Sequence, residues 1–263
     1  MNRIGVEVSG AVLAVSVVDG DGPVVVLGHG VGSSAMFLHE TFGAAFAAAG
    51  LRLAAVDLRG HGDSSSARAL DDHALDVHAA DLARVCQTLG AAGVGGVSIG
   101  AMAAVRAVAG GLCVKAVLAV IPGWTGRSPA GHGPHAALAT EIRSVGVAGM
   151  LARLEAEPEL PAWVREVVLR DYRRHDVDSL RAALLSLDGA EGPSLAEIKS
   201  IDAPLAVVGW PDDPGHPLLV AESWSEAAGT SSMVQTSIAA MQDDRAALGV
   251  AACSAFALCG FPG

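Results

Sequence analysis

A serine lies in a short glycine-flanked motif that is typical of nucleophilic catalysis. The segment Gly96-Val97-Ser98-Ile99-Gly100 has the pattern G-x-S-x-G, which in many enzymes places a serine hydroxyl on a sharp turn between a strand and a helix. In that setting the backbone N–H of Ile99, at the start of the helix, would point at a developing oxyanion. The chain contains 32 glycines, so the pattern also arises by chance, and the surrounding elements decide its meaning.

Three further polar motifs each follow an apolar run. Residues 28–34 read GHGVGSS, and the N–H of Val31 is a candidate for a second oxyanion donor. The simpler alternative for this segment is a glycine turn capped by a serine. Residues 57–64 read DLRGHGDS, and a later GWPDDP contains Asp212 and Asp213 side by side. An aspartate in such a loop can orient a catalytic histidine, or it can simply cap a turn or a helix.

Short apolar runs alternate with helical stretches along much of the chain. The first two runs, at 3–8 and 11–18, are separated by Ser9-Gly10 and predict a hairpin. The remaining predicted strands are 24–28, 53–56, 93–97, 115–121, 204–209 and 232–237, and helices are predicted at about 34–49, at about 74–89, after Ser98 and from Asp243. Such alternation predicts a mostly parallel sheet with helices on both faces, formed by residues 1–121 and 204–263.

The alternation is interrupted between 115–121 and 204–209. Residues 122–203 show only helical periodicity, punctuated by glycine and proline. A block of helices inserted between two strands of a parallel sheet predicts a helical cap over the C-terminal edge of the sheet, where open α/β sheets bind ligands.

The order and spacing of these motifs resemble those of the α/β-hydrolase superfamily over essentially the whole chain. The resemblance implies the α/β-hydrolase fold, a mostly parallel central sheet with helices on both faces and a helical cap insertion. It also implies Ser98 as the nucleophile, the amides of Val31 and Ile99 as the oxyanion hole, and an acid after the 204–209 strand. Asp213 is the first candidate for this acid, and Asp212 is the second.

One member of the implied triad is missing from its usual place. In this superfamily a histidine follows the last strand, but here that segment reads SIAAMQDD, and no histidine occurs after His216. His216 is a candidate base in the same loop as the acid, although it follows Asp213 by only three residues, which is too close for the usual relay. A serine hydroxyl without an adjacent base is a poor nucleophile. The sequence therefore predicts an incomplete triad.

Aromatic side chains are expected near Ser98. His132 and His135, at the start of the cap, either overhang the serine or are solvated loop residues. Trp124 and Trp210 follow strand ends and either line an apolar pocket or pack in the core.

The residues at the position of the missing histidine, and the remaining histidines, also lead to structural expectations. Ile238 and Met241 stand where the histidine is missing and would make the pocket drier. His29, a further pocket candidate, and His61 are expected to order the backbone of their loops. The other four histidines are expected on helix surfaces: His39, His73, His78 and His175.

Composition excludes several classes of function. The net charge of −11 argues against a nucleic-acid or anionic-membrane partner, because such surfaces need clustered Lys and Arg. The four cysteines lack the spacing of a metal site, and no metal or cofactor is expected. No apolar leader opens the chain, so a cytoplasmic location is expected. The uncharged last eighteen residues predict a buried terminal helix more readily than a membrane span.

Three functions remain compatible with the sequence, and none of them specifies the oligomeric state. The first is hydrolysis of an ester, thioester or amide of a small or medium organic substrate by Ser98, with a displaced or missing base. The second is a non-hydrolytic reaction (that of an epimerase, lyase, dehydratase or cyclase) in which the oxyanion hole stabilises an enolate. This possibility resembles atypical superfamily members such as the bottromycin epimerase, which isomerises a peptide stereocentre. The third is a catalytically silent role in which the pocket binds a small ligand or a protein partner. In the first two the substrate is a small molecule or a peptide.

Overall fold

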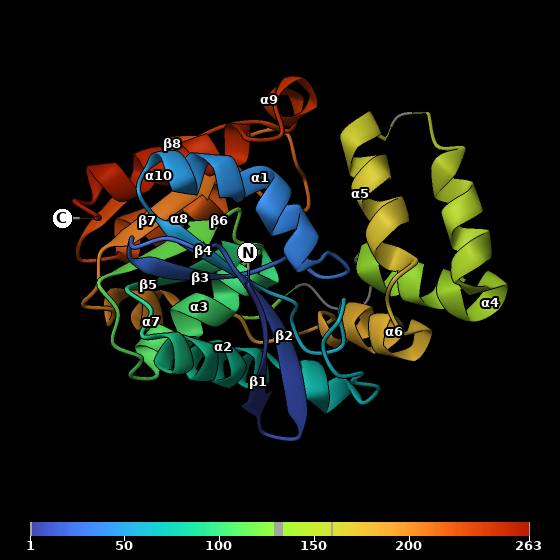
Figure 1. Cartoon of the computed structure of the whole chain (residues 1–263). Coiled ribbons are helices and arrows are strands. Elements are labelled where there is room, and N and C mark those ends of the chain that lie inside the picture. Colours follow the sequence, from blue (N-terminus) through green and yellow to red (C-terminus); the bar gives the residue numbers. More distant parts are fainter. Residues whose placement is uncertain (1, 129–133, 159, 263) are drawn as a thin grey trace.

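An eight-stranded sheet forms the centre of the protein (Figure 1). The structure is a computed structural model that describes residues 2–128, 134–158 and 160–262. The spatial order of the strands is β1-β2-β4-β3-β5-β6-β7-β8. Only the pairs β1/β2 and β2/β4 are antiparallel, and all later neighbours run parallel. The strands are β1 (Asn2–Val8), β2 (Ala11–Val17), β3 (Val24–Gly28), β4 (Arg52–Val56), β5 (Gly93–Val97), β6 (Ala116–Val120), β7 (Leu205–Gly209) and β8 (Ser231–Gln235).

Helices cover both faces of the sheet because its central strands are apolar on both sides. Every residue of β3, β5, β6 and β7 is buried, as expected for parallel strands enclosed by helices. One face packs against α1 (Ala35–Ala48) and α10 (Ala247–Leu258). The other face packs against α2 (Leu75–Leu89), α3 (Ile99–Ala109) and α8 (Leu218–Ala227). The predicted α/β-hydrolase fold is confirmed by this architecture.

Among the described residues, four helices lie between β6 and β7 in the sequence. They are α4 (Pro134–Glu155), α5 (Ala162–Tyr172), α6 (Val177–Ser186) and α7 (Leu195–Lys199). The first three share an apolar cluster of their own and stand to one side of the sheet (Figure 1). Helix α7 instead packs against α3 and α8 of the sheet domain. The structural separation therefore falls before α7, whereas the cap predicted from the sequence runs to residue 203.

The segment after β8 contains one helix more than the sequence indicates. A short helix, α9 (Ile238–Asp243), occupies the expected loop, and the terminal helix begins at Ala247 rather than at Asp243. A brief 3-10 turn, η1 (Leu70–His73), precedes α2. In the part of the chain that the structure describes, no helix is both long and apolar enough to cross a membrane.

Candidate active site

Ser98 lies on a strained turn between β5 and α3. Its backbone angles are φ 54° and ψ −114°, a conformation that non-glycine residues seldom adopt and that clusters at functional sites. The flanking glycines permit the turn because α3 approaches β3 closely. A Cβ on Gly100 would lie 2.2 Å from the carbonyl oxygen of Gly28, and a Cβ on Gly96 would lie 2.4 Å from the same atom. The G-x-S-x-G spacing is thus required by packing.

The hydroxyl of Ser98 is the first member of a hydrogen-bonded relay. His216 Nε2 lies 2.9 Å from Ser98 Oγ, and His216 Nδ1 lies 2.6 Å from Asp213 Oδ2. A carboxylate can only accept, so Nδ1 carries the ring proton and Nε2 is left as an acceptor for the serine hydroxyl. A serine, an imidazole and a carboxylate are thus hydrogen-bonded in the order Ser98, His216, Asp213, a geometry that the sequence analysis did not expect for His216. A catalytic role for the three stays a prediction.

A tight turn explains how His216 reaches back to an aspartate only three residues earlier. Asp213 Oδ1 accepts the N–H of Gly215 at 2.8 Å, and the carbonyl of Asp213 accepts the N–H of His216 at 3.2 Å. These two bonds reverse the chain, so the imidazole folds back over the carboxylate that precedes it. The sequence-based argument that His216 is too near Asp213 fails because it assumed a more extended loop.

The two adjacent aspartates have different hydrogen-bond partners in the structure. Burial by itself would raise the pKa of Asp213, but the hydrogen bond and charge of His216 and the N–H of Gly215 hold it below its usual value. Asp212 points elsewhere and accepts the N–H of Ile238 at 3.1 Å with each oxygen. Asp212 therefore holds the start of α9, and Asp213 is the aspartate that contacts the histidine.

The loop that contains Val31 is fixed against Ser98 by two buried histidines. His29 Nε2 accepts the N–H of Leu58 at 3.0 Å, and His61 Nε2 accepts the N–H of Gly32 at 3.1 Å. A Cβ on Gly30 would lie 3.6 Å from Ser98 Cβ, so the loop passes directly over the serine. The N–H of Ile99 lies in the first turn of α3, where no intrahelical acceptor exists. The assignment of the Val31 and Ile99 amides as an oxyanion hole stays a prediction.

A cavity of about 550 Å³ opens beside the turn that carries His216, and Ser98, His216 and Asp213 are not themselves part of its wall. Its wall includes Trp124, His135, Leu187 and Val220, together with Pro214 and Gly215 from the turn that carries His216. Burial lowers the pKa of His135, the nearby His216 lowers it further, and Asp213 opposes the shift. An imidazole whose pKa is lowered by burial is thus part of the cavity wall. Of the aromatic pocket candidates, Trp124 and His135 are in the wall of this cavity, and a role for either of them at Ser98 stays a prediction.

Other pocket candidates lie elsewhere. His29, Trp210 and Met241 are 0%, 4% and 0% exposed, and none of them is in the wall of this cavity. Trp210 and Met241 both belong to the buried apolar cluster on the face of the sheet that α1 and α10 cover, and Met241 enters it from α9. Ile238 is half-buried and its carbonyl accepts the indole N–H of Trp163. His132 lies outside the residues that the structure describes.

The histidines predicted on helix surfaces form a feature that sequence reasoning missed. His73, His78 and His175 are 2%, 3% and 7% exposed, which contradicts that prediction. They join His29 and His61 in a chain of ring contacts with centroids 5.0–6.1 Å apart. Burial lowers the pKa of each of the five, that of His78 to about 3. Three loops converge at this point, and that convergence has no local signal in the sequence.

Within the ranges 2–128, 134–158 and 160–262, no group of three or more His, Cys, Asp or Glu side chains is arranged to hold a metal ion.

Comparison with known proteins gives the family. The model of the alpha/beta hydrolase family matches residues 11–247. The chain belongs to this family. As an alpha/beta hydrolase, it has no match among curated proteins, but its fold is shared with many solved structures.

Three solved structures illustrate the range of relatives. The enol-lactonase from Burkholderia xenovorans LB400 is 18% identical, with 89% of this chain and 91% of that chain covered and a TM-score of 0.71. The esterase EaEST from Exiguobacterium antarcticum is 19% identical, with coverages of 88% and 89% and a TM-score of 0.72. The bottromycin epimerase BotH, in complex with bottromycin A2, is 21% identical, with both chains covered completely and a TM-score of 0.70. At these identities the likeness concerns the fold of this alpha/beta hydrolase and not its reaction.

Proposed function

We propose that the protein is a serine hydrolase that cleaves an ester, thioester or amide of a small or medium, largely apolar organic substrate. The observation that carries the proposal is the relay from Ser98 through His216 to Asp213, with distances of 2.9 and 2.6 Å. A base within hydrogen-bond reach is what converts a weakly nucleophilic hydroxyl into a reactive one.

The proposed mechanism uses these three side chains in sequence. Ser98 Oγ attacks the carbonyl carbon of the substrate while its proton moves to His216 Nε2. Asp213 stabilises the resulting imidazolium, and the amides of Val31 and Ile99 stabilise the negative charge on the former carbonyl oxygen. Collapse of this intermediate expels the leaving group, which takes the proton from His216, and leaves an acyl group on Ser98.

Water completes the cycle by the same route. A water molecule transfers a proton to His216 Nε2 and attacks the acyl carbon. The second intermediate expels Ser98 Oγ, which recovers the proton. The products are a carboxylic acid and the alcohol, thiol or amine that left first.

The cavity beside the relay indicates the kind of substrate. Most of its wall is apolar, contributed by Trp124, Leu187, Pro217, Leu219 and Val220. A volume of about 550 Å³ lies within the range of small-molecule sites. An uncharged acyl or alcohol portion would bury its apolar surface there, and the esterase and lactonase among the structural neighbours act on bonds of this class.

The test is hydrolysis of a series of p-nitrophenyl esters, from acetate to octanoate, by the wild type and by Ser98→Ala. We expect turnover by the wild type and a loss of at least about 10³-fold in the variant. Ser223→Ala, at the wall of the same cavity, is the matched control and should retain activity, because its hydroxyl bonds only the carbonyl of Val220. A fluorophosphonate should label the wild type and not Ser98→Ala. Equal p-nitrophenol release from wild type and Ser98→Ala would overturn the proposal.

Epimerisation is a second candidate, and His135 is the observation that favours it. Inversion at a carbon acid needs a proton acceptor on one face and a proton donor on the other. His135 is in the cavity wall and close enough to His216 for the two imidazoles to interact electrostatically, and the complete mutual coverage with the bottromycin epimerase is compatible with such use. In that case a peptide substrate would acquire deuterium from D₂O at the inverted carbon, and Ser98→Ala would retain the exchange.

A further inference from the structure

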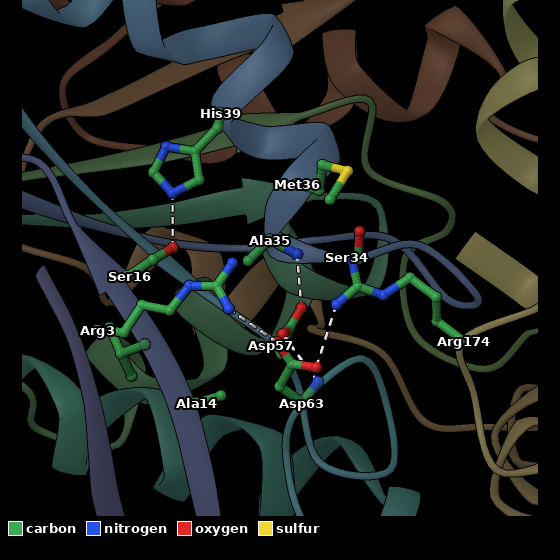
Figure 2. Close-up of a pocket in the computed structure, with 11 residues that line it drawn as sticks. Arg3, Ala14, Ser16, Ser34, Ala35, Met36, His39, Asp57, Asp63 and Arg174 are labelled. Atoms are coloured by element: carbon green, nitrogen blue, oxygen red, sulfur yellow. Dashed lines mark hydrogen bonds and ion pairs between the residues drawn. The ribbon is translucent and has the colours of Figure 1, made fainter. Parts of the chain in front are cut away.

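A second cavity lies between the β1–β2 hairpin and the start of α1 (Figure 2). Its volume is about 310 Å³, and Arg174, from the turn after α5, closes one side of it. None of Ser98, His216 and Asp213 belongs to its wall. It also shares no wall residue with the cavity of about 550 Å³, so the two are separate cavities.

Two arginines in this cavity share a single aspartate. Arg3 Nη1 donates to Asp63 Oδ2 at 3.3 Å, and Arg174 Nη2 donates to Asp63 Oδ1 at 3.1 Å. Figure 2 shows the two guanidinium groups reaching Asp63 from opposite sides. Within the described part of the chain, Asp63 is the one carboxylate that either guanidinium contacts. The three side chains together therefore carry one positive charge in excess, in a protein with a net charge of −11.

The other carboxylate in the wall does not cancel this excess by contact with the arginines. Asp57 Oδ1 accepts the N–H of Ala35 at 2.7 Å, and Asp57 Oδ2 accepts the N–H of Asp63 at 3.0 Å. Both oxygens are thus engaged by backbone amides, one of them at the positive end of α1. Asp57 therefore does not compete for the N–H groups of the arginines, although its charge brings the sum over the four charged side chains to zero, so an anion here would be held by directed hydrogen bonds.

Unused hydrogen-bond donors remain around the cavity. A guanidinium has five N–H groups, and each arginine donates only one of them to Asp63. The hydroxyl of Ser34 is buried, with the residue 2% exposed, and it has no hydrogen-bond partner in the part of the chain that the structure describes. An unsatisfied buried hydroxyl costs free energy unless a ligand or water completes it.

The rest of the wall is mixed. Ala14 of β2 and Ala35 and Met36 of α1 contribute carbon surface, and Ser16 and His39 are hydrogen-bonded to each other. A bare inorganic anion would leave this surface in contact with water. A ligand with a short hydrocarbon portion would cover it and gain from its burial.

We propose that this cavity binds the carboxylate of a small organic acid. The carboxylate bridges the guanidinium groups of Arg3 and Arg174 and accepts the hydroxyl of Ser34, and the hydrocarbon portion of the acid packs on Met36. Planar, paired N–H donors of arginine match the two oxygens of a carboxylate. Ser34 immediately follows the loop over Ser98, Arg174 lies in the turn after α5, and Arg3 belongs to the β1–β2 hairpin. A bound carboxylate would therefore link these three segments.

The test is titration calorimetry with hexanoate, hexanamide and inorganic phosphate on Ser98→Ala protein, which removes any turnover from the heats. We expect saturable binding of hexanoate at one site and much weaker binding of hexanamide, which has the same chain without the charge. Phosphate binding as tight as that of hexanoate overturns the organic-acid assignment. Absence of hexanoate binding overturns the site altogether.

Variants assign the binding to this cavity. Arg174→Gln should weaken hexanoate binding roughly tenfold or more, because it removes charge-assisted hydrogen bonds. Asp63→Asn should tighten binding, because it removes the carboxylate that competes for both arginines, and a merely damaged fold would not produce that gain. Arg143→Gln, an exposed arginine of α4, is the matched control and should bind as the parent does. Weaker binding in Asp63→Asn, or an unchanged dissociation constant in Arg174→Gln, contradicts the proposal.

Discussion

Substitution of the adjacent aspartates by asparagine tests the relay most sharply. Asp213 and Asp212 are neighbours in sequence, and asparagine preserves the size of either side chain. In the structure only Asp213 contacts His216, at 2.6 Å, whereas Asp212 accepts backbone N–H groups at the start of α9. The two substitutions should therefore differ greatly in their effect on activity and little in their effect on folding.

The magnitude follows from the tautomer of His216. An amide NH₂ opposite Nδ1 favours a proton on Nε2 instead, and Nε2 then cannot accept the proton of Ser98. In serine proteases this exchange lowers kcat by about 10⁴, which corresponds to about 5.4 kcal/mol in the activation barrier. We expect a loss of the same order in Asp213→Asn. Asp212→Asn should keep activity within a few-fold, because asparagine caps a helix about as well as aspartate.

The assay is kcat/KM on a p-nitrophenyl ester together with the rate of labelling by a fluorophosphonate. Thermal unfolding by circular dichroism checks that both variants are folded. In Asp213→Asn the N–H of Gly215 can still donate to the amide oxygen of the new side chain, so the turn should persist. If Asp212→Asn loses activity and Asp213→Asn keeps it, the relay described above is not the catalytic one.

Three further predictions concern the base, the buried histidines and the serine turn. His216→Gln should lower kcat at least about 10³-fold, whereas His135→Gln should change hydrolysis far less because it does not contact Ser98. Buried histidines with lowered pKa values bind fewer protons in the folded state than in the unfolded state. Their contribution to the free energy of unfolding should therefore be constant above about pH 6.5 and should fall as the pH drops below that value. His78→Leu should reduce that slope by about one proton, or about 1.4 kcal/mol per pH unit, in urea titrations between pH 8 and 5. Gly100→Ala should destabilise by more than about 2 kcal/mol, since its Cβ meets the backbone of Gly28, while Gly43→Ala, with open space in α1, should stabilise by about 0.5–1 kcal/mol.

Each of these three has a result that contradicts it. Comparable losses in the two histidine variants would mean that the imidazole nearest the serine is not the base. A pH slope unaltered by the loss of His78 would show that this ring does not titrate on unfolding. Equal stability of the two alanine variants would mean that β3 and α3 do not approach each other as described.

Features governed by local patterns were predictable from the sequence. Strand runs such as 93–97, the turn at Ser98 and the loop over it follow from apolar periodicity and from glycines that sterics demand. The fold was therefore accessible before the structure. The packing of α7 against the sheet domain could not be predicted, because a helix of five residues is too short to show a periodicity that identifies its packing surface.

The relay depended on geometry that spacing does not encode. The prediction that His216 lies too close to Asp213 treated the distance along the chain as a distance in space, and the bond between Asp213 and the N–H of Gly215 reverses that inference. The burial of His73, His78 and His175 was likewise not predictable from spacing along the chain. A polar ring on an amphipathic helix is predicted to be solvated, and only the convergence of distant loops buries it.

The aspartate and the histidine of the relay lie within four consecutive residues, 213–216, so a circular permutation elsewhere in the chain need not separate them. The stretch after β8, where the sequence analysis looked for the histidine, contributes the helix α9 that Asp212 caps and no relay member. New termini placed between β8 and α9, with the natural ends joined by a linker, would leave every atom of the relay on an uninterrupted segment. A circular permutant opened at residues 236–237 should therefore remain a competent catalyst if it folds.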